Sequence, residues 1–448
     1  MEKVMIGMAG ISFSKSFWGF IPEEYRKRAT QLKELASKLD ADFMAMEDTF
    51  QDAEGAAKAA VAMNRADIAV LDVATYPEGK AAMTFFDALK VPLVLWSRDE
   101  SVHGTHIGHN SFCGANFLSG NLGLRGTRFR VLHGELNDPQ IIARLRTTVR
   151  LIGAAKAAAG TKIGLFGDGI VPKFYDIDIN EKDRATLAAR YGIQFVGVPI
   201  KDLVDRAKSY DDATAANDAK AFAKRFTLVA VGNEGLEKQA RILAAIRDLS
   251  AEGKFTSVAI RCWPELQSMY GTWPCPSLSA LNDIGIPAAC EGDPGGALDM
   301  LLASKLTKTP STLMDIVDWD DKSGTFAIWH CGPTACSWAD NGSAKLLPHD
   351  VDGRTPDGKP ALGLPSIVDM DFAPGKVTVY RTLGALDDEF VIQGEIIRTP
   401  ERHICGSFGT VANSTIYGRP VSAVTIRETI LTRSLPHHYT AARGHLFA

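Results

Sequence analysis

The first 320 residues alternate short apolar runs with segments whose apolar residues recur at helical spacing. An apolar run at residues 4–8 precedes an amphipathic segment at 22–39, and the same order repeats along the chain. Alternation of this kind is typical of βαβ units, whose parallel strands are joined by crossover helices. It predicts doubly wound parallel sheets, and the 448-residue length predicts more than one hydrophobic core.

The alternation also predicts where the individual elements lie. Further strands are predicted at residues 68–73, 91–96, 162–166, 195–199, 226–232, 257–261 and 286–290. Helices are predicted at residues 52–63, 83–89, 138–160, 181–190, 215–225, 235–251 and 276–284. The long helix at 138–160 is expected to connect two α/β domains.

After residue 320 the pattern changes to β-branched segments separated by turns. Strands at 324–329, 376–380, 389–398 and 421–426 predict a mostly antiparallel arrangement, either a sandwich or a barrel. The expected fold class is therefore α/β, with two doubly wound, Rossmann-like domains at 1–160 and 161–322. A mostly antiparallel, β-rich domain is expected at 323–448.

Composition and charge exclude several functions. A net charge of -4 argues against nucleic-acid binding, and no apolar span is long enough for a membrane helix. The first strand is not followed by a G-x-G-x-x-G turn, which argues against a dinucleotide cofactor. The seven cysteines lack paired Cys-x-x-Cys spacing, and the start of the chain lacks the features of a signal peptide. These observations favour a cytoplasmic protein.

A Glu-Gly-Asp turn, Glu291 to Asp293, ends the apolar run at 286–290. In open α/β sheets, ligands bind beyond the carboxyl ends of the strands. Either acid could instead cap the helix that follows. Aspartate is the better capping residue, and Asp293 directly precedes Pro294. Asp293 is therefore expected to cap the helix, which leaves Glu291 available for another role.

Other polar residues lie near strand ends. Asp315 interrupts the apolar run 313–317, where a carboxylate is costly unless it is paired or bound to a metal. His330 precedes a Cys-Gly-Pro turn, and Arg261 ends another strand; each could contact a ligand or be a structural residue. His438 lies in a C-terminal Pro-His-His-Tyr run, and an imidazole with two carboxylates suits Mn²⁺, Fe²⁺ or Zn²⁺. Spacing alone does not connect His438 with Glu291.

The run Gly-Ile-Pro-Ala-Ala-Cys-Glu-Gly-Asp-Pro-Gly-Gly-Ala-Leu, with Asp315 24 residues after Glu291, resembles the metal site of the L-fucose isomerase and L-arabinose isomerase superfamily. The C-terminal segment Pro-His-His-Tyr-Thr-Ala-Ala-Arg-Gly-His is similar to the family's histidine-containing segment. The length of the chain is nearer to that of the compact, fucose isomerase-like members.

The resemblance implies a divalent metal, typically Mn²⁺, bound by Glu291, Asp315 and His438. It implies a metal-dependent aldose–ketose isomerase that works through a cis-enediolate, with Glu291 and Asp315 as the acid/base pair. His330 would be a further metal or substrate contact. The family also implies a homotrimer or homohexamer.

The substrate is less restricted by the sequence. A pentose, a deoxyhexose and an anionic or sulfonated sugar all fit the resemblance. Arg261, as a substrate contact, and Lys173 would suit an anionic sugar, although either can be a structural charge. Two other functions stay open: an epimerase or lyase that uses the same metal site on a modified sugar or sugar acid, and a non-catalytic sugar-binding protein.

Overall fold

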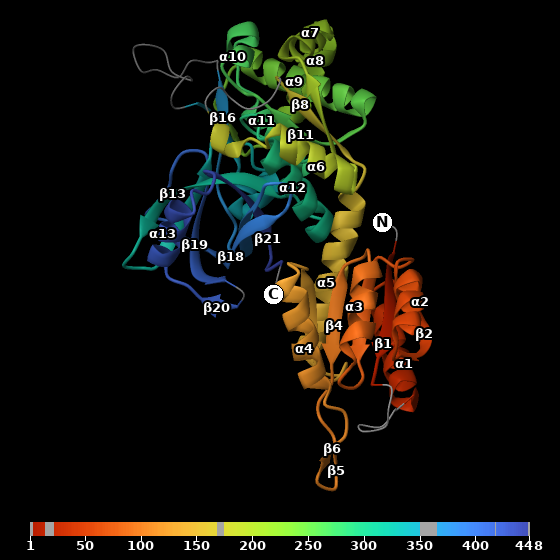
Figure 1. The fold of residues 1–448 in the computed structure, drawn as a ribbon. Helices are drawn as coiled ribbons and strands as arrows, with labels where there is room; N and C mark the ends of the chain where they lie inside the picture. Colours follow the sequence, from red (N-terminus) through yellow and green to blue (C-terminus); the bar gives the residue numbers. More distant parts are fainter. Residues whose placement is uncertain (1–2, 14–21, 168–173, 350–364, 417, 447–448) are drawn as a thin grey trace. The chain divides into compact units, whose positions relative to one another are not determined.

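The computed structural model describes residues 3–13, 22–167, 174–349, 365–416 and 418–446. The chain forms two compact units, Met1–Ala157 and Ala158–Phe447 (Figure 1). The further division of the second part at residue 322 stays a prediction. No helix among the described residues is long and apolar enough to span a membrane.

The first unit is built on a five-stranded parallel sheet of order β2-β1-β3-β4-β7. Its strands are β1 (Val4–Ile11), β2 (Ala41–Phe50), β3 (Ile68–Val73), β4 (Leu93–Ser97) and β7 (Phe129–His133). One face is covered by α2 (Ala53–Met63), α3 (Gly79–Ala88) and α4 (Ser111–Leu124), and the other by α1 (Pro22–Lys38) and α5 (Pro139–Ala158). A small hairpin, β5 (Val102–His103) and β6 (His106–Ile107), precedes α4. Helices on both faces confirm the doubly wound prediction.

Five elements of this unit were not predicted from the sequence: β2, the hairpin strands β5 and β6, α4 and β7. Strand β2 is an edge strand with several exposed positions, so it lacks the continuous apolar run of a central strand. Helix α4 contains three glycines, each of which lowers helix propensity by about 1 kcal/mol relative to alanine. Burial of one of its sides, through residues such as Ala115, Leu118 and Leu122, compensates for this weak propensity.

The second unit begins with a four-stranded parallel sheet of order β12-β11-β8-β9. The strands are β8 (Lys162–Phe166), β9 (Gln194–Val198), β11 (Phe255–Ile260) and the short β12 (Ala288–Ala289). The intervening helices are η1 (Tyr175–Ile177), α6 (Glu181–Tyr191), α7 (Ile200–Ser209), α8 (Asp212–Ala223), α9 (Asn233–Gly253), α10 (Glu265–Tyr270), α11 (Cys275–Asp283) and α12 (Pro294–Thr307). The predicted parallel βα alternation is confirmed here too.

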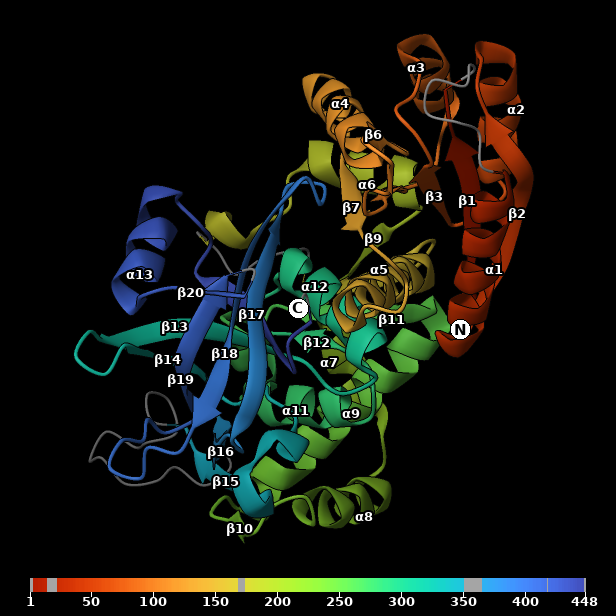
Figure 2. The same cartoon turned by 90° about the horizontal axis from the view of Figure 1, so that it is seen from below.

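A mostly antiparallel sheet follows, in which six strands close into a barrel (Figure 2). In ring order these are β19 (Ser407–Ile416), β14 (Thr325–His330), β13 (Thr312–Asp320), β21 (His438–Arg443), β17 (Gly375–Leu383) and β18 (Asp388–Ile397), which pairs back with β19. The sheet is extended by β16 (Ser366–Asp371), β15 (Lys345–Pro348), β10 (Leu228–Val229) and β20 (Arg419–Pro420), and two short turns of helix, η2 (Cys336–Trp338) and η3 (Asp340–Gly342), lie between β14 and β15. The closed ring is a barrel rather than a sandwich.

One predicted strand was wrong, and another is shorter than predicted and lies in a different sheet. Residues 421–426 begin the helix α13 (Ala423–Thr432), because the Ser422 side chain accepts a hydrogen bond from the Thr425 N–H and Ala423 and Ile426 bury one helical face. Residues 226–232 contribute only β10, which pairs with β15 instead of joining the parallel sheet. Asp315 likewise lies within the antiparallel strand β13, and not at the carboxyl end of a parallel strand.

Candidate metal centre

Three side chains predicted to bind a metal come together in the second unit. The Nε2 atom of His438 lies 3.3 Å from Oε2 of Glu291 and 3.8 Å from Oδ1 of Asp315. Two ligands bound to one ion at 2.0–2.2 Å can be at most about 4.4 Å apart. His438 is therefore close enough to share one small cation with either carboxylate. The potential ligands form two overlapping groups, Glu291 with His437 and His438, and Asp315 with His330 and His438.

Glu291 follows β12 in a conformation that favours glycine. Its φ is 59°, in the left-handed region, and Gly292 continues the turn with φ 70°. The Gly292 N–H donates to the Ile260 carbonyl at the end of β11, which ties the turn to the neighbouring strand. A non-glycine residue in this region costs roughly 1–2 kcal/mol. The cost of keeping glutamate there is consistent with a use for its carboxylate.

Strand register places Asp315 beside His438. In the antiparallel pair β13–β21, Asp315 is directly opposite His438. Directly opposite residues point to the same face of the sheet, with their Cβ atoms only about 4.5–5.5 Å apart. Their close approach is therefore a property of the backbone pairing and not of one flexible side chain.

His438 is oriented by Asp293. Its Nδ1 lies 3.0 Å from Oδ2 of Asp293, and both side chains are buried. An ionised carboxylate can only accept a hydrogen bond, so Nδ1 carries a proton and Nε2 is the nitrogen left to bind a metal. Histidine ligands of metals are commonly held by a carboxylate in this way.

Asp293 has three roles. It caps α12 by accepting the Gly296 N–H, as the sequence predicted. It also receives two hydrogen bonds from the buried Arg381, Nη1 to Oδ2 at 2.7 Å and Nη2 to Oδ1 at 2.9 Å. A Cβ at Gly295 would lie 2.5 Å from Nη2 of Arg381, so this glycine is needed for the close approach. The third role, holding His438, was not found from the sequence.

His330 presents a different nitrogen chemistry. The Cys331 N–H donates to Nδ1 of His330 at 2.8 Å, so this nitrogen carries no proton. In the neutral ring the proton is then on Nε2, which is buried without a hydrogen-bond partner among the described residues. One ring nitrogen of His330 lies within 4.8 Å of ligand atoms of Asp315 and His438. This tautomer makes His330 a hydrogen-bond donor towards the site, in contrast to His438.

Several buried polar atoms of this cluster have no hydrogen-bond partner in the described part of the chain. They are Oδ1 of Asp315, Nε2 of His330 and Nε2 of His438. A buried polar atom without a partner costs roughly 1–3 kcal/mol, so such atoms are few in native proteins. Three of them facing one another are explained by a cation or a polar ligand, and the mixed nitrogen and oxygen donors suit a divalent metal.

Neighbouring histidines keep the carboxylate of Glu291 ionised. Burial acts to raise the pKa of Glu291, but contacts with His437 and His438 outweigh it and lower this pKa to about 2. Burial raises the pKa of Asp315, and nearby histidines offset this only in part. Burial acts to lower the pKa of His438, but the hydrogen bond to Asp293 raises it. The net result is a pKa of about 10. A metal at Nε2 must therefore displace a proton.

The remaining site predictions have different outcomes. Arg261 follows β11, but its guanidinium pairs with Glu265 and donates to the Gly167 carbonyl at 3.3 Å. Lys173 lies outside the described residues. His437, which directly precedes His438, has Nε2 at 3.8 Å from Glu291 and is held by Asp176 through Nδ1 at 2.6 Å. Arg381 gave one sequence signal, a charged residue that directly follows the apolar and β-branched run 377–380.

The buried carboxyl group of Asp299 leads to a prediction about how stability depends on pH. Burial raises the pKa of Asp299 to about 7, and Arg381 counteracts it only in part. Between about pH 4 and pH 7 the folded protein then keeps a proton that the unfolded chain has lost, so stability falls by about 1.4 kcal/mol per pH unit in this window. Asparagine in Asp299→Asn can still bond to the Thr382 N–H and hydroxyl, which Asp299 contacts now.

As the pH is raised from 5 to 7, we expect the native sequence to lose stability through Asp299 and the Asp299→Asn variant to be spared this loss. The unfolding free energy of the variant, minus that of the native sequence, should therefore increase. Urea denaturation of both proteins at several pH values measures this difference, in which other titrating groups cancel. A constant difference across the range would show that Asp299 is ionised in the folded state at pH 5.

Comparison with known proteins gives the class of activity. No family model matches the chain. The chain is 25% identical over 340 residues to the sulfoquinovose isomerase of Alkalicoccus urumqiensis, covering 75% of this chain and 74% of that protein. It is 23% identical over 319 residues to the sulfoquinovose isomerase of Priestia aryabhattai, covering 71% and 69%. A 145-residue match, 24% identical, links it to the L-arabinose isomerase of Geobacillus thermodenitrificans, covering 31% and 28%. These similarities support the conclusion that the chain is an isomerase, an intramolecular oxidoreductase that acts on sugars.

Proposed function

We propose that the chain is a divalent-metal-dependent aldose–ketose isomerase, with Glu291, Asp315 and His438 as ligands of Mn²⁺ or a similar ion. The observation that carries the proposal is the convergence of these side chains, two of which have buried atoms without a partner among the described residues. When bound, a divalent cation supplies Lewis-acid polarisation of the sugar oxygens and fixes their orientation.

The chain itself supplies the proton transfers. Interconversion of an aldose and a ketose moves a proton between C2 and C1 and another between the two oxygens, through an enediolate. Glu291 and Asp315 are the proposed acid/base pair, and positioned proton transfer of this kind contributes roughly 10²–10⁴-fold. The low pKa of Glu291 keeps its carboxylate ionised, as a metal ligand must be.

His330 is proposed to bind the substrate rather than the metal. Its Nδ1 is engaged by the Cys331 N–H, so Nε2 is the donor that faces the site. A buried N–H donor is suited to a sugar hydroxyl or carbonyl oxygen. This assignment distinguishes it from His438, whose Nε2 lone pair faces the same space.

The proposed substrate is a sulfonated sugar such as sulfoquinovose. Two relatives bear the name sulfoquinovose isomerase. Arg261 is the proposed contact for the anionic group, for which it would exchange its pairing with Glu265. A homotrimer or homohexamer and a cytoplasmic location stay predictions, and light scattering on the purified protein measures the first of these.

The test is product analysis in D₂O with sulfoquinovose and Mn²⁺. We expect a ketose to form, with hydrogen exchange at C1 and C2 detected by NMR. Activity should fall to background after dialysis against a chelator and return with Mn²⁺. An epimer as the product, or an unsaturated or cleaved acid, would instead establish the epimerase or lyase alternative. Full activity of a protein shown to contain no metal would exclude the metal-dependent mechanism.

A further inference from the structure

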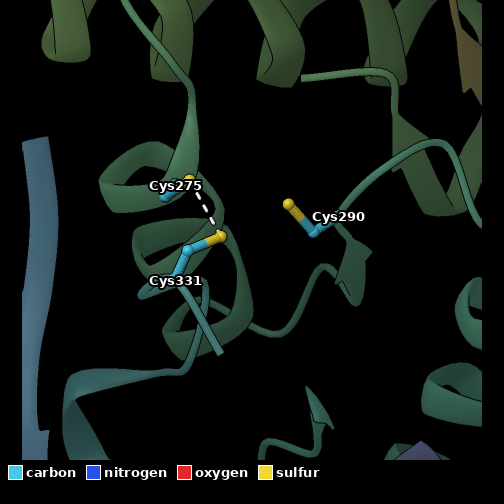
Figure 3. Close-up of side chains that lie close together, drawn as sticks. All are labelled: Cys275, Cys290 and Cys331. Carbon is cyan, nitrogen blue, oxygen red and sulfur yellow. Dashed lines mark hydrogen bonds between the residues drawn. The ribbon is translucent and has the colours of Figure 1, made fainter. Parts of the chain in front are cut away.

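Four cysteines of the second unit meet in its core. Sγ of Cys275 lies 3.6 Å from Sγ of Cys331, and Sγ of Cys290 lies 3.6 Å from Sγ of Cys262. The sulfurs of Cys275, Cys290 and Cys331 are all within 4.8 Å of one another. Figure 3 shows the Cys290 sulfur directed towards the Cys275–Cys331 pair. Four of the seven cysteines of the chain are thus gathered at one place.

Two of the separations between these sulfurs are close to those of a tetrahedral thiolate site. Zinc binds cysteine sulfur at about 2.3 Å, so two sulfurs on one tetrahedral ion are about 3.8 Å apart. The observed 3.6 Å separations are close to this value and far from the length of a disulfide bond, about 2.0 Å. The cysteines are free thiols. Three of the sulfurs, those of Cys275, Cys290 and Cys331, are close to one another, and Cys262 lies 3.6 Å from Cys290 but outside this group of three. As the fourth ligand of a structural zinc site, Cys262 would have to move towards the ion.

The cysteines come from four separate segments, three of which carry a proposed site residue. Cys262 directly follows Arg261, and Cys290 directly precedes Glu291. Cys331 follows His330, and its N–H fixes the ring of that histidine. The fourth, Cys275, is the first residue of α11.

Burial distinguishes this cluster from the metal centre. The side chains of Cys262, Cys275 and Cys290 are 2% exposed or less, and only Cys331 is partly exposed. Structural zinc sites are closed, with four protein ligands and no open position, whereas catalytic sites keep a position for water or substrate. Soft sulfur ligands also select a different ion from the carboxylates and imidazole of the centre around Glu291.

We propose that Cys262, Cys275, Cys290 and Cys331 form a second, structural metal site that takes a thiophilic divalent ion of the zinc type. The ion would join the ends of β11, β12 and β14 to the start of α11, beneath the side chains that form the metal centre. Its role would be to hold the segments that carry Arg261, Glu291 and His330 in register. This inference does not depend on the isomerase assignment, because it concerns different ligands.

The test begins with the native sequence, purified under reducing conditions with zinc present during expression. After dialysis against a chelator that strips the oxygen- and nitrogen-liganded centre, we expect about one zinc per chain to remain by elemental analysis. X-ray absorption at the zinc edge should show sulfur neighbours at about 2.3 Å. A protein with no retained zinc, or with zinc bound only by nitrogen and oxygen, would overturn the proposal.

Single substitutions distinguish zinc bound by the cysteines from metal bound at the centre around Glu291. Cys275→Ser should lose the retained zinc and the sulfur signal, whereas Glu291→Gln should keep both. Cys113→Ser, which changes an exposed cysteine of the first unit, is the matched control and should also keep both. If Cys275→Ser retained a full zinc equivalent with an unchanged sulfur signal, the cluster would not be the site. Should Cys275→Ser fail to fold, the absorption spectrum of the native sequence still decides the question.

Discussion

Replacement of Glu291 by glutamine is expected to reduce sugar isomerisation by at least about 10³-fold and to leave the fold intact. The substitution keeps the size of the side chain but removes the charge that holds a cation and the group that accepts a proton. The side chain is 17% exposed and contacts His437 and His438, so its neighbours lose a counter-charge without a cavity being formed.

The measurements are kcat and KM with Mn²⁺, metal content, and circular dichroism of the purified variant. Glu428→Gln, at an exposed position of α13, is the matched control and should behave like the native sequence. A Glu291→Gln protein that folds and turns over substrate within about tenfold of the native rate would remove Glu291 from the acid/base pair.

Replacement of Arg381 by glutamine is expected to cause the largest loss of stability, about 3–5 kcal/mol. The guanidinium and the Asp293 carboxylate are 3% and 0% exposed, and removing one partner of a buried ion pair leaves the other charge without compensation. Because Asp293 also orients His438, metal affinity should fall by roughly 10–100-fold. Urea denaturation without metal and calorimetric titration with Mn²⁺ measure the two effects separately.

Arg398 provides the control for this prediction. It makes the same two-nitrogen contact with Asp340, at 2.6 and 3.0 Å, but on the exposed surface. Arg398→Gln should therefore change stability little, since exposed ion pairs contribute little. Arg381→Lys keeps one charge without the two-pronged geometry and should fall between the two variants. If Arg381→Gln and Arg398→Gln lost the same unfolding free energy, burial of the Arg381–Asp293 pair would not increase the cost of breaking it.

The fold was largely predictable because its signals are local. Apolar runs and helical spacing indicated the parallel sheets of both units, and the turn-rich second half indicated the antiparallel sheet. The misses occurred where context outweighed composition. The β-branched residues of 421–426 belong to a helix because Ser422 caps it, and the glycines of α4 are outweighed by burial.

The candidate site was only partly predictable. The sequence by itself distinguished Asp293 from Glu291, because helix capping is decided by residues three positions apart. It could not show that Asp293 also binds His438, 145 residues away, or that Arg381 reaches Asp293 through a gap left by a glycine.

Those contacts exist because the antiparallel pairing of β13 with β21 sets Asp315 opposite His438, while the turn after β12 holds Glu291 in a left-handed conformation. Strand register between distant segments depends on the packing of the whole barrel. Only the tertiary structure could therefore decide which histidine supplies a lone pair to the centre and which donates a proton.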